Sequence, residues 1–378
     1  MALRIGFDAK RAVSNNTGLG NYSRLVIDVL SEYYPDGEYW LYAPKIKENP
    51  RLSELLLRKN VGLHAPATAS GRALPSLWRV GRGLVGDFER DGVDIFHGLS
   101  NELPLAHTDV PTVVTIHDLI FRYYPHCYKP IDRKIYDYKF RKACESATHV
   151  IAVSECTKRD IVRDYGISPD KISVIYQGCH RNFRRKCDTT EIEAVRSRYE
   201  LPQGRFVLYV GSIEERKNAL LAVKALRNLP ADIKLVLVGR ETKYAGLIHD
   251  YVSAHGLENR VLFRRISFTD LPAAYQMAST FVYPSRYEGF GIPILEALCS
   301  STPVVAATGS CLEEAGGKSS IYVHPDDDEA LARALLSTIE DEGLRATMIA
   351  DGIEHSLRFA PEVMAREIME VYNNVLMK

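Results

Sequence analysis

The sequence predicts an α/β protein made of two Rossmann-like, doubly wound domains, and three observations carry that prediction. Short apolar runs alternate with amphipathic stretches, which is the pattern of parallel βαβ units. A second complete series of such units begins near residue 205. The chain has 378 residues, which suits two or three domains at roughly 100–200 residues each.

The first series is expected to form one layered sheet. A helix at residues 21–32 gathers its apolar side chains on one face. Strands followed by helices in this way indicate parallel pairing, with helices covering the sheet. The expected strands of this half are residues 3–7, 39–43, 93–96, 112–116 and 150–153.

The second series reads as a complete doubly wound sheet by itself. Its strands are expected at residues 206–210, 234–238, 261–263, 280–283 and 303–306. Its helices are expected at residues 219–229, 244–255, 271–277 and 329–339, and another opens at 293–298.

The join between the halves is expected near residues 181–200, a charged stretch that buries little. We therefore predict one domain at residues 1–188 and a second at 189–360, with a last helix at 361–378 packing back on the first. Open α/β sheets bind ligands beyond the carboxyl ends of their strands, so the expected site is a cleft between the two domains.

Composition excludes several classes of protein. With 46% hydrophobic and 25% charged residues, the chain is not disordered, a coiled coil or collagen-like. The net charge of zero argues against a protein that coats nucleic acid. Residues 1–190 hold 28 Lys and Arg against 22 Asp and Glu, and residues 191–378 hold 20 against 26. This asymmetry, +6 and −6, indicates that one domain faces something anionic.

The cysteine pattern and the termini predict a cytoplasmic location. The 7 cysteines form no C-x-x-C, which favours a reducing compartment. The N-terminus is too polar for a signal peptide, and no stretch of about 18 apolar residues is present to cross a membrane.

The strongest motif is a pair of glutamates, Glu288 and Glu296, separated by seven residues. Gly289 and Gly291 lie between them and would let backbone N–H groups approach a ligand, while Pro293 suits the first turn of a helix. A carboxylate at Glu296 could accept two hydroxyl hydrogen bonds, as a ribose diol offers. The alternatives are that Glu296 only complements the helix N-terminus and that Glu288 is a solvated loop acid.

This glutamate pair resembles the E-x7-E signature of glycosyltransferase family 4, retaining enzymes with the GT-B fold, and the resemblance covers nearly the whole chain. The variants His-Asp-Leu at 117–119 and Arg-Lys-Asn at 216–218 most resemble bacterial mannosyltransferases of surface-polysaccharide synthesis. Many members have arginine where this chain has Ser212, which would shift part of the phosphate clamp to Arg216. The other matching segments are residues 17–22, 116–119, 152–155, 210–212 and 303–306.

The resemblance implies a hexosyltransferase that takes its sugar from a nucleotide-sugar donor, and GDP-mannose is the donor that we expect. It also implies that the enzyme uses no cofactor and no metal. Residues 189–360 would bind the donor, and residues 1–188 a saccharide or lipid-linked saccharide acceptor. Glu288 would hold the sugar hydroxyls and Glu296 the ribose. A UDP-sugar-dependent transferase, a sugar-nucleotide epimerase on the same fold and a non-catalytic scaffold are the alternatives. The remaining residues expected to line the donor site are Gly211, Phe290, Gly291 and Ile292.

Arg216 and Lys217 follow the strand at 206–210 and are expected to open the next helix. Two cations beside a helix N-terminus suit a diphosphate, and they would neutralise the leaving nucleoside diphosphate. The alternative is a pair of solvated surface cations. His117 follows the strand at 112–116, and the resemblance places it beside the transferred sugar; the alternative is a loop capping pair with Asp118.

Gly18 and Gly20 are expected in a glycine turn whose N–H groups face the donor phosphate or the acceptor, or in a simple turn. Ser23 replaces the third glycine of a dinucleotide fingerprint, so we reject NAD binding. Ser154 is expected to cap a helix. The four acids at 326–329, which follow Pro325, lead straight into a helix, so we expect a helix cap and not a metal site.

A basic and aromatic stretch at residues 121–142 suits either the headgroups of anionic lipid or an ordinary amphipathic core helix. It lacks any accompanying motif for nucleic acid. The expected location is therefore the cytoplasm, or the inner face of the plasma membrane.

Overall fold

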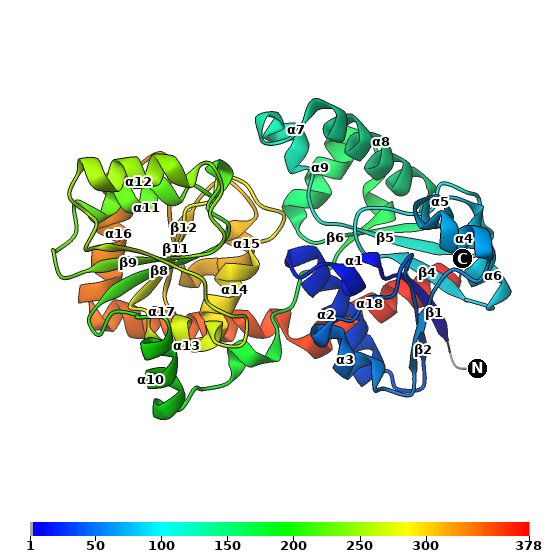
Figure 1. Cartoon of the computed structure of the whole chain (residues 1–378), viewed down its shortest axis with the longest axis horizontal. Coiled ribbons are helices and arrows are strands. Elements are labelled where there is room, and N and C mark those ends of the chain that lie inside the picture. The colour runs from blue at the N-terminus through cyan, green and yellow to red at the C-terminus, as the bar shows by residue number, and fades with distance from the viewer. Residues whose placement is uncertain (1–2, 378) are drawn as a thin grey trace. The chain divides into compact units, whose positions relative to one another are not determined.

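The computed structural model describes residues 3–377, and these divide into two compact units (Figure 1). Unit 1 runs to Gly178 and resumes at Pro361, and unit 2 is Cys179–Ala360. The division after Gly178 lies before the expected boundary at 188. The reason is that η3 (Arg181–Arg184) and α10 (Thr189–Arg198) pack on α13 (Leu271–Met277) and α14 (Ile292–Cys299) of unit 2.

Unit 1 contains a parallel sheet in the order β3-β2-β1-β4-β5-β6-β7. The short edge strands β3 and β7 were not predicted. The strands are β1 (Arg4–Asp8), β2 (Glu38–Tyr42), β3 (Val61–His64), β4 (Ile95–Gly98), β5 (Thr112–Ile116), β6 (His149–Ala152) and β7 (Ile172–Val174). The helices are α1 (Lys10–Ser14), α2 (Gly18–Tyr33), α3 (Pro50–Leu56), α4 (Ala69–Ala73), α5 (Pro75–Val80), α6 (Arg82–Arg90), α7 (Ile120–Tyr123), α8 (Pro130–Ser146), α9 (Glu155–Tyr165) and α18 (Pro361–Leu376), with 3-10 turns η1 (Pro125–Cys127) and η2 (Pro169–Lys171).

Unit 2 contains a parallel sheet in the order β10-β9-β8-β11-β12-β13. The strands are β8 (Phe206–Val210), β9 (Lys234–Val238), β10 (Val261–Arg264), β11 (Thr280–Tyr283), β12 (Val304–Ala307) and β13 (Ile321–Val323). The further helices are α11 (Ala219–Leu226), α12 (Ala245–Ala254), α13 (Leu271–Met277), α14 (Ile292–Cys299), α15 (Leu312–Gly316), α16 (Asp328–Glu340) and α17 (Glu342–Ser356), with turns η4 (Glu215–Lys217), η5 (Gly317–Ser319) and η6 (Leu357–Phe359).

Both sheets reverse their strand order once. In unit 1 the reversal lies between β1 and β4, where Phe7 pairs with His97. In unit 2 it lies between β8 and β11, where Leu208 pairs with Phe281. The loops at the carboxyl ends of these strand pairs diverge to opposite faces of the sheet and leave the crevice that ligands occupy in such folds.

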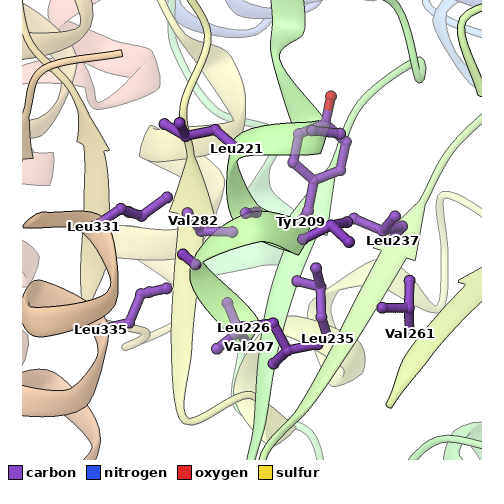
Figure 2. Close-up of a cluster of buried hydrophobic side chains, with 14 of the residues drawn as sticks. Val207, Tyr209, Leu221, Leu226, Leu235, Leu237, Val261, Val282, Leu331 and Leu335 are labelled. Atoms are coloured by element: carbon purple, nitrogen blue, oxygen red, sulfur yellow. The ribbon is translucent and has the colours of Figure 1, made fainter. Parts of the chain in front are cut away.

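The core of unit 2 lies between its sheet and the helices α11 and α16 (Figure 2). Val207 and Tyr209 of β8, Leu235 of β9 and Leu226 of α11 all belong to this cluster, and all of these side chains are buried. Burying a large aliphatic side chain contributes about 1.5–3 kcal/mol. This packing holds β8 and β11, and hence the loops that follow them, in place.

The C-terminal helix α18 packs against α2 in unit 1 (Figure 1). Its Tyr372 is buried, and its hydroxyl lies 2.6 Å from Nδ1 of His97 on β4. The other ring nitrogen of His97 lies 2.8 Å from the Thr115 hydroxyl. Burial lowers the pKa of His97 to about 3, so the ring is neutral and anchors the helix rather than facing a ligand.

Gly18 and Gly20 lie in the first turn of α2, after the N-cap Thr17, and not in a loop before the helix, while their expected role in ligand binding stays a prediction. A Cβ at Gly20 would lie 1.8 Å from the backbone oxygen of Asn15, whereas nothing lies within 4 Å of one at Gly18. Gly20 therefore allows the chain after α1 to approach α2 closely.

We expect Gly20→Ala to destabilise unit 1 by about 1–3 kcal/mol, because the backbone must shift to admit the methyl group. Gly18→Ala is the matched control, and it should be neutral or stabilising by up to about 1 kcal/mol. Thermal denaturation of both variants checks this. Equal melting temperatures would show that the close approach at Gly20 is unimportant.

Candidate active site

Arg216 and Lys217 lie in the turn η4, after the carboxyl end of β8. They do not open the following helix as expected, because Asn218 takes a left-handed conformation (φ 56°) and α11 begins only at Ala219. The Asn218 side chain donates to the backbone oxygens of Pro284 (3.2 Å) and Pro325 (2.7 Å). The two cations are thereby turned from the helix towards the loop that follows β11.

Glu288 lies in that loop and is the centre of the site. Arg216 Nη1 lies 2.8 Å and Lys217 Nζ 3.4 Å from its Oε1. The hydroxyls of Tyr283 (2.9 Å) and Ser285 (2.8 Å) donate to the same oxygen. Within residues 3–377, no hydrogen bond is donated to the second oxygen, Oε2. The carboxylate therefore keeps one oxygen for a ligand.

Charge keeps Glu288 ionised. Burial alone would raise the pKa of its carboxyl, but Arg216 and then Lys217 outweigh burial, and the two hydroxyls add to them. Together they lower the pKa to about 2. Burial opposes ionisation of the Arg216 guanidinium too, yet Glu288 raises its pKa above the usual value. The pair is thus permanently charged at neutral pH.

Arg216 and Lys217 differ in how many of their hydrogen-bond donors are already used within the protein. Arg216 donates through Nη1 to the Tyr287 backbone oxygen and through Nη2 to Glu214 (2.8 Å), besides contacting Glu288. Lys217 Nζ donates to the Tyr283 hydroxyl (3.0 Å) and has further protons, because an ammonium carries three donors. Arg216 mainly holds the loop and Glu288, while Lys217 is the better placed to contact an anion.

Glu296 lies in α14, and its environment is opposite to that of Glu288. Burial raises the pKa of its carboxyl to about 8, although the hydrogen bond from Tyr275 opposes this rise. The Tyr275 hydroxyl donates to Oε2 at 2.9 Å. At neutral pH Glu296 is therefore mostly protonated, so it offers a donor as well as acceptors.

The segment between the glutamates forms the N-terminus of α14. Gly291 is the N-cap with φ of 115°, a conformation that favours glycine. The Phe290 ring is buried and packs edge-on against Phe359 at 5.4 Å, so its side chain supports the loop. Gly211 directly follows β8, and a Cβ there would lie 3.3 Å from Cδ of Lys217.

His117 lies in unit 1, one residue after β5, and is buried. Its Nε2–H donates to the Leu99 oxygen at 2.9 Å, and its Nδ1 lies 3.3 Å from the Gln177 side-chain nitrogen. Its backbone N–H donates to Asn101 Oδ1 at 2.7 Å. Burial lowers the pKa of the ring to about 4, so it is neutral. Both ring nitrogens are already engaged within unit 1.

Two expected helix caps are confirmed. The Ser154 hydroxyl accepts from Thr157 N at 3.0 Å at the start of α9. Asp327 accepts from Ala330 N at 2.7 Å at the start of α16.

Several residues of the site were not found from the sequence. Tyr283, Ser285 and Tyr275 orient the two glutamates, and Gln177 and Asn101 hold His117. Tyr283 and Ser285 are polar residues at the carboxyl end of a buried strand, which is a signal that sequence reasoning could have used.

Comparison with known proteins agrees with this arrangement. Residues 28–183 match the family profile Glycosyltransferase Family 4, and residues 191–355 match Glycosyl transferases group 1. Two parallel-sheet domains carrying these profiles define a GT-B glycosyltransferase. The chain belongs to glycosyltransferase family 4, as its motifs predicted.

Individual proteins resemble the chain at moderate identity. O-antigen chain mannosyltransferase B of Escherichia coli is 29% identical over 284 residues, which is 74% of each chain. O-antigen chain mannosyltransferase RfbU of Salmonella typhimurium is 29% identical over 61% of this chain and 62% of its own length. The structure of Anabaena HepE in complex with UDP superposes with a TM-score of 0.76 at 20% identity, covering 99% of this chain and 100% of HepE.

Among the described residues, no helix combines the length and apolar character needed to cross a bilayer.

The raised pKa of Glu296 predicts a pH-dependent stability. Below about pH 4 the carboxyl is protonated in both the folded and the unfolded state. As the pH rises towards 8, the carboxyl ionises only in the unfolded state. The free energy of unfolding of the wild type therefore falls by up to about 1.4 kcal/mol per pH unit. Glu296→Gln lacks this loss, and its melting temperature relative to wild type should rise from pH 5 to pH 8.

Glu54→Gln, at an exposed glutamate of α3, is the control and should track wild type at every pH. A constant difference between Glu296→Gln and wild type across this range would contradict a raised pKa.

Proposed function

We propose that the chain is a retaining hexosyltransferase that moves mannose from GDP-mannose onto a saccharide or lipid-linked saccharide in cell-surface polysaccharide synthesis. The observation that carries the proposal is the charged cluster of Glu288, Arg216 and Lys217 at the strand-order reversal of unit 2. The names of the O-antigen mannosyltransferases among its relatives support mannose and a surface polysaccharide.

Departure of the nucleoside diphosphate is the step that the cluster serves. The bond between the sugar and the donor phosphate breaks as the acceptor oxygen bonds the same carbon, and negative charge grows on the phosphate oxygens. Lys217 would stabilise that charge by donating hydrogen bonds from the N–H groups that it has left, and Arg216 would keep the loop in place. Preorganised charges in a site closed to water stabilise such a transition state strongly. This step needs no metal in the proposed mechanism.

The two glutamates would recognise different parts of the donor. Ionised Glu288 would accept hydrogen bonds from sugar hydroxyls through Oε2, and Glu296 would bind the ribose diol. Retention follows if the acceptor attacks from the leaving-group face while the donor phosphate takes its proton, as the family resemblance implies. Proton NMR of the product anomer tests retention: a β-linked mannoside formed from the α-linked donor would contradict it.

A thermal-shift series tests the donor. GDP-mannose and GDP, but not UDP, UDP-glucose or UDP-GlcNAc, should raise the melting temperature by a few degrees, since a ligand at about 100 times its Kd adds about 2.7 kcal/mol. Lys217→Gln should abolish the shift, whereas Lys318→Gln, at an exposed lysine, should retain it. Transfer should persist in EDTA.

Three outcomes contradict parts of the proposal. A thermal shift with UDP species alone would contradict GDP-mannose as the donor, but it would not contradict the transferase function. No shift with any donor would favour a non-catalytic scaffold. Activity that EDTA abolishes and Mn²⁺ restores would overturn the metal-free mechanism.

We also propose that unit 1 contacts anionic lipid through α8. Ile131, Ile135 and Tyr138 are exposed by 66%, 44% and 55%, although α8 buries its opposite face in the core. Lys134 and Lys142 lie on the same exposed face, because the spacing from residue 131 is helical. Aliphatic, aromatic and basic side chains together suit the headgroup region of a bilayer.

Ile131→Asp with Ile135→Asp should reduce co-sedimentation with phosphatidylglycerol vesicles several-fold, because both side chains would leave the bilayer interface. Leu247→Asp, at an exposed leucine of unit 2, is the control. If the α8 double variant and the Leu247→Asp control sediment equally with the vesicles, α8 does not contact lipid.

A further inference from the structure

Unit 1 has a strand-order reversal of its own, between β1 and β4. The chain leaves β1 at Asp8 and passes directly through Lys10 and Arg11, while the loop after β4 carries Glu102. His117 follows β5, the next strand of the sheet. Because the strands are parallel, all of these residues lie at one edge, where open sheets bind ligands.

The acidic groups at this edge are already paired. Arg79 is buried and lies 2.6 Å from Asp8 and 2.7 Å from Glu102. Lys139 reaches the same Glu102 oxygen at 3.4 Å. Arg79 and Lys139 together thus balance the charge of the two carboxylates. The charges of Lys10 and Arg11 come in addition to this balance.

Among residues 3–377, neither Lys10 nor Arg11 forms an ion pair with a carboxylate within 4.0 Å, although Glu102 and Asp8 attract Lys10 at longer range. Both are half-buried, and within residues 3–377 neither the Lys10 ammonium nor the Arg11 guanidinium donates a hydrogen bond. Burial, and then repulsion from Arg79 and Arg11, lowers the pKa of Lys10 below its usual value, even though Glu102 and Asp8 oppose this shift. The positive charge of Arg11 also reaches His117 and helps to lower the pKa of that ring. The four cations Lys10, Arg11, Arg79 and Lys139 therefore outnumber the two carboxylates at this edge, which is electropositive.

We propose that Lys10 and Arg11 bind a phosphate group of a substrate at the strand-order reversal of unit 1. Half-buried cations that form no close ion pair with a carboxylate are suited to a phosphate, which accepts several charge-assisted hydrogen bonds. The phosphate belongs either to a phosphorylated or lipid-linked acceptor or to the donor diphosphate. The choice between those two sources rests on the proposed transferase function, but phosphate binding itself does not.

The test uses the full chain and inorganic phosphate as the probe. Phosphate is titrated by calorimetry in the presence of saturating GDP, which occupies the site around Lys217. Lys10→Gln with Arg11→Gln should weaken phosphate binding at least about tenfold, since charge-assisted hydrogen bonds are lost. Lys59→Gln with Lys318→Gln removes the same charge from exposed positions and should change it less than twofold.

The outcomes also separate the two sources. If phosphate binds beside GDP and the double variant leaves GDP affinity unchanged, the site serves an acceptor phosphate. If GDP excludes phosphate and the double variant weakens GDP about tenfold, the site serves the donor diphosphate. If phosphate and GDP affinities of the double variant match those of the control, the proposal is overturned.

Two further measurements keep the test independent of folding and of the proposed function. Arg11→Lys retains the charge, so it should keep phosphate affinity within about threefold, and melting curves should show that every variant is folded. If GDP does not bind at all, the proposal of GDP-mannose as the donor fails. The phosphate titration is then made in a Lys217→Gln background, where loss of binding on changing Lys10 and Arg11 still decides the proposal.

Discussion

The site in unit 2 depends on how one buried carboxylate is neutralised. Removing Glu288 from water costs several kcal/mol unless charges and hydrogen bonds replace its hydration. All of the replacements come to a single oxygen, from the loops after β8 and β11. The same loops are tied directly, because Arg286 N–H donates to the Arg216 oxygen at 2.9 Å and Arg216 donates to the Tyr287 oxygen. Neutralising Glu288 therefore also sets the shape of the loops, and it leaves Oε2 for recognition.

The two units use the same topological position, and at both positions cations surround buried carboxylates. At the reversal of unit 2 one carboxylate is matched by two cations, and Lys217 still has donors to offer. At the reversal of unit 1 the carboxylates are taken by Arg79 and Lys139, so that Lys10 and Arg11 are in excess. The surplus of basic residues in the first half of the sequence thus has a local counterpart at a ligand-binding edge.

Sequence patterns predicted those parts of the fold that depend on local apolar runs. The strands at 206–210, 234–238 and 280–283 end where they were expected, because each is a continuous apolar run between polar turns. The edge strand Val61–His64 was missed, since it is short and interrupted by Gly62. Chemistry-bearing residues were recognised by type and position, but their partners were not. Tyr275 pairs with Glu296 across 21 residues, and such a pairing follows from the packing of α13 on α14, which no local pattern contains.

The spacing of the glutamate pair suggested two similar acceptors, and the structure separates them into two chemical states. Glu288, beside two cations, has a pKa of about 2 and can only accept hydrogen bonds; Glu296, raised by burial to about 8, carries a proton at neutral pH. A diol that donates two hydrogen bonds to Glu296 would favour its ionised form and expel that proton. A diol that takes the proton as a hydrogen bond would keep it. Recognition at Glu296 is therefore coupled to proton release, whereas recognition at Glu288 is not, because Arg216 and Lys217 have already fixed its charge.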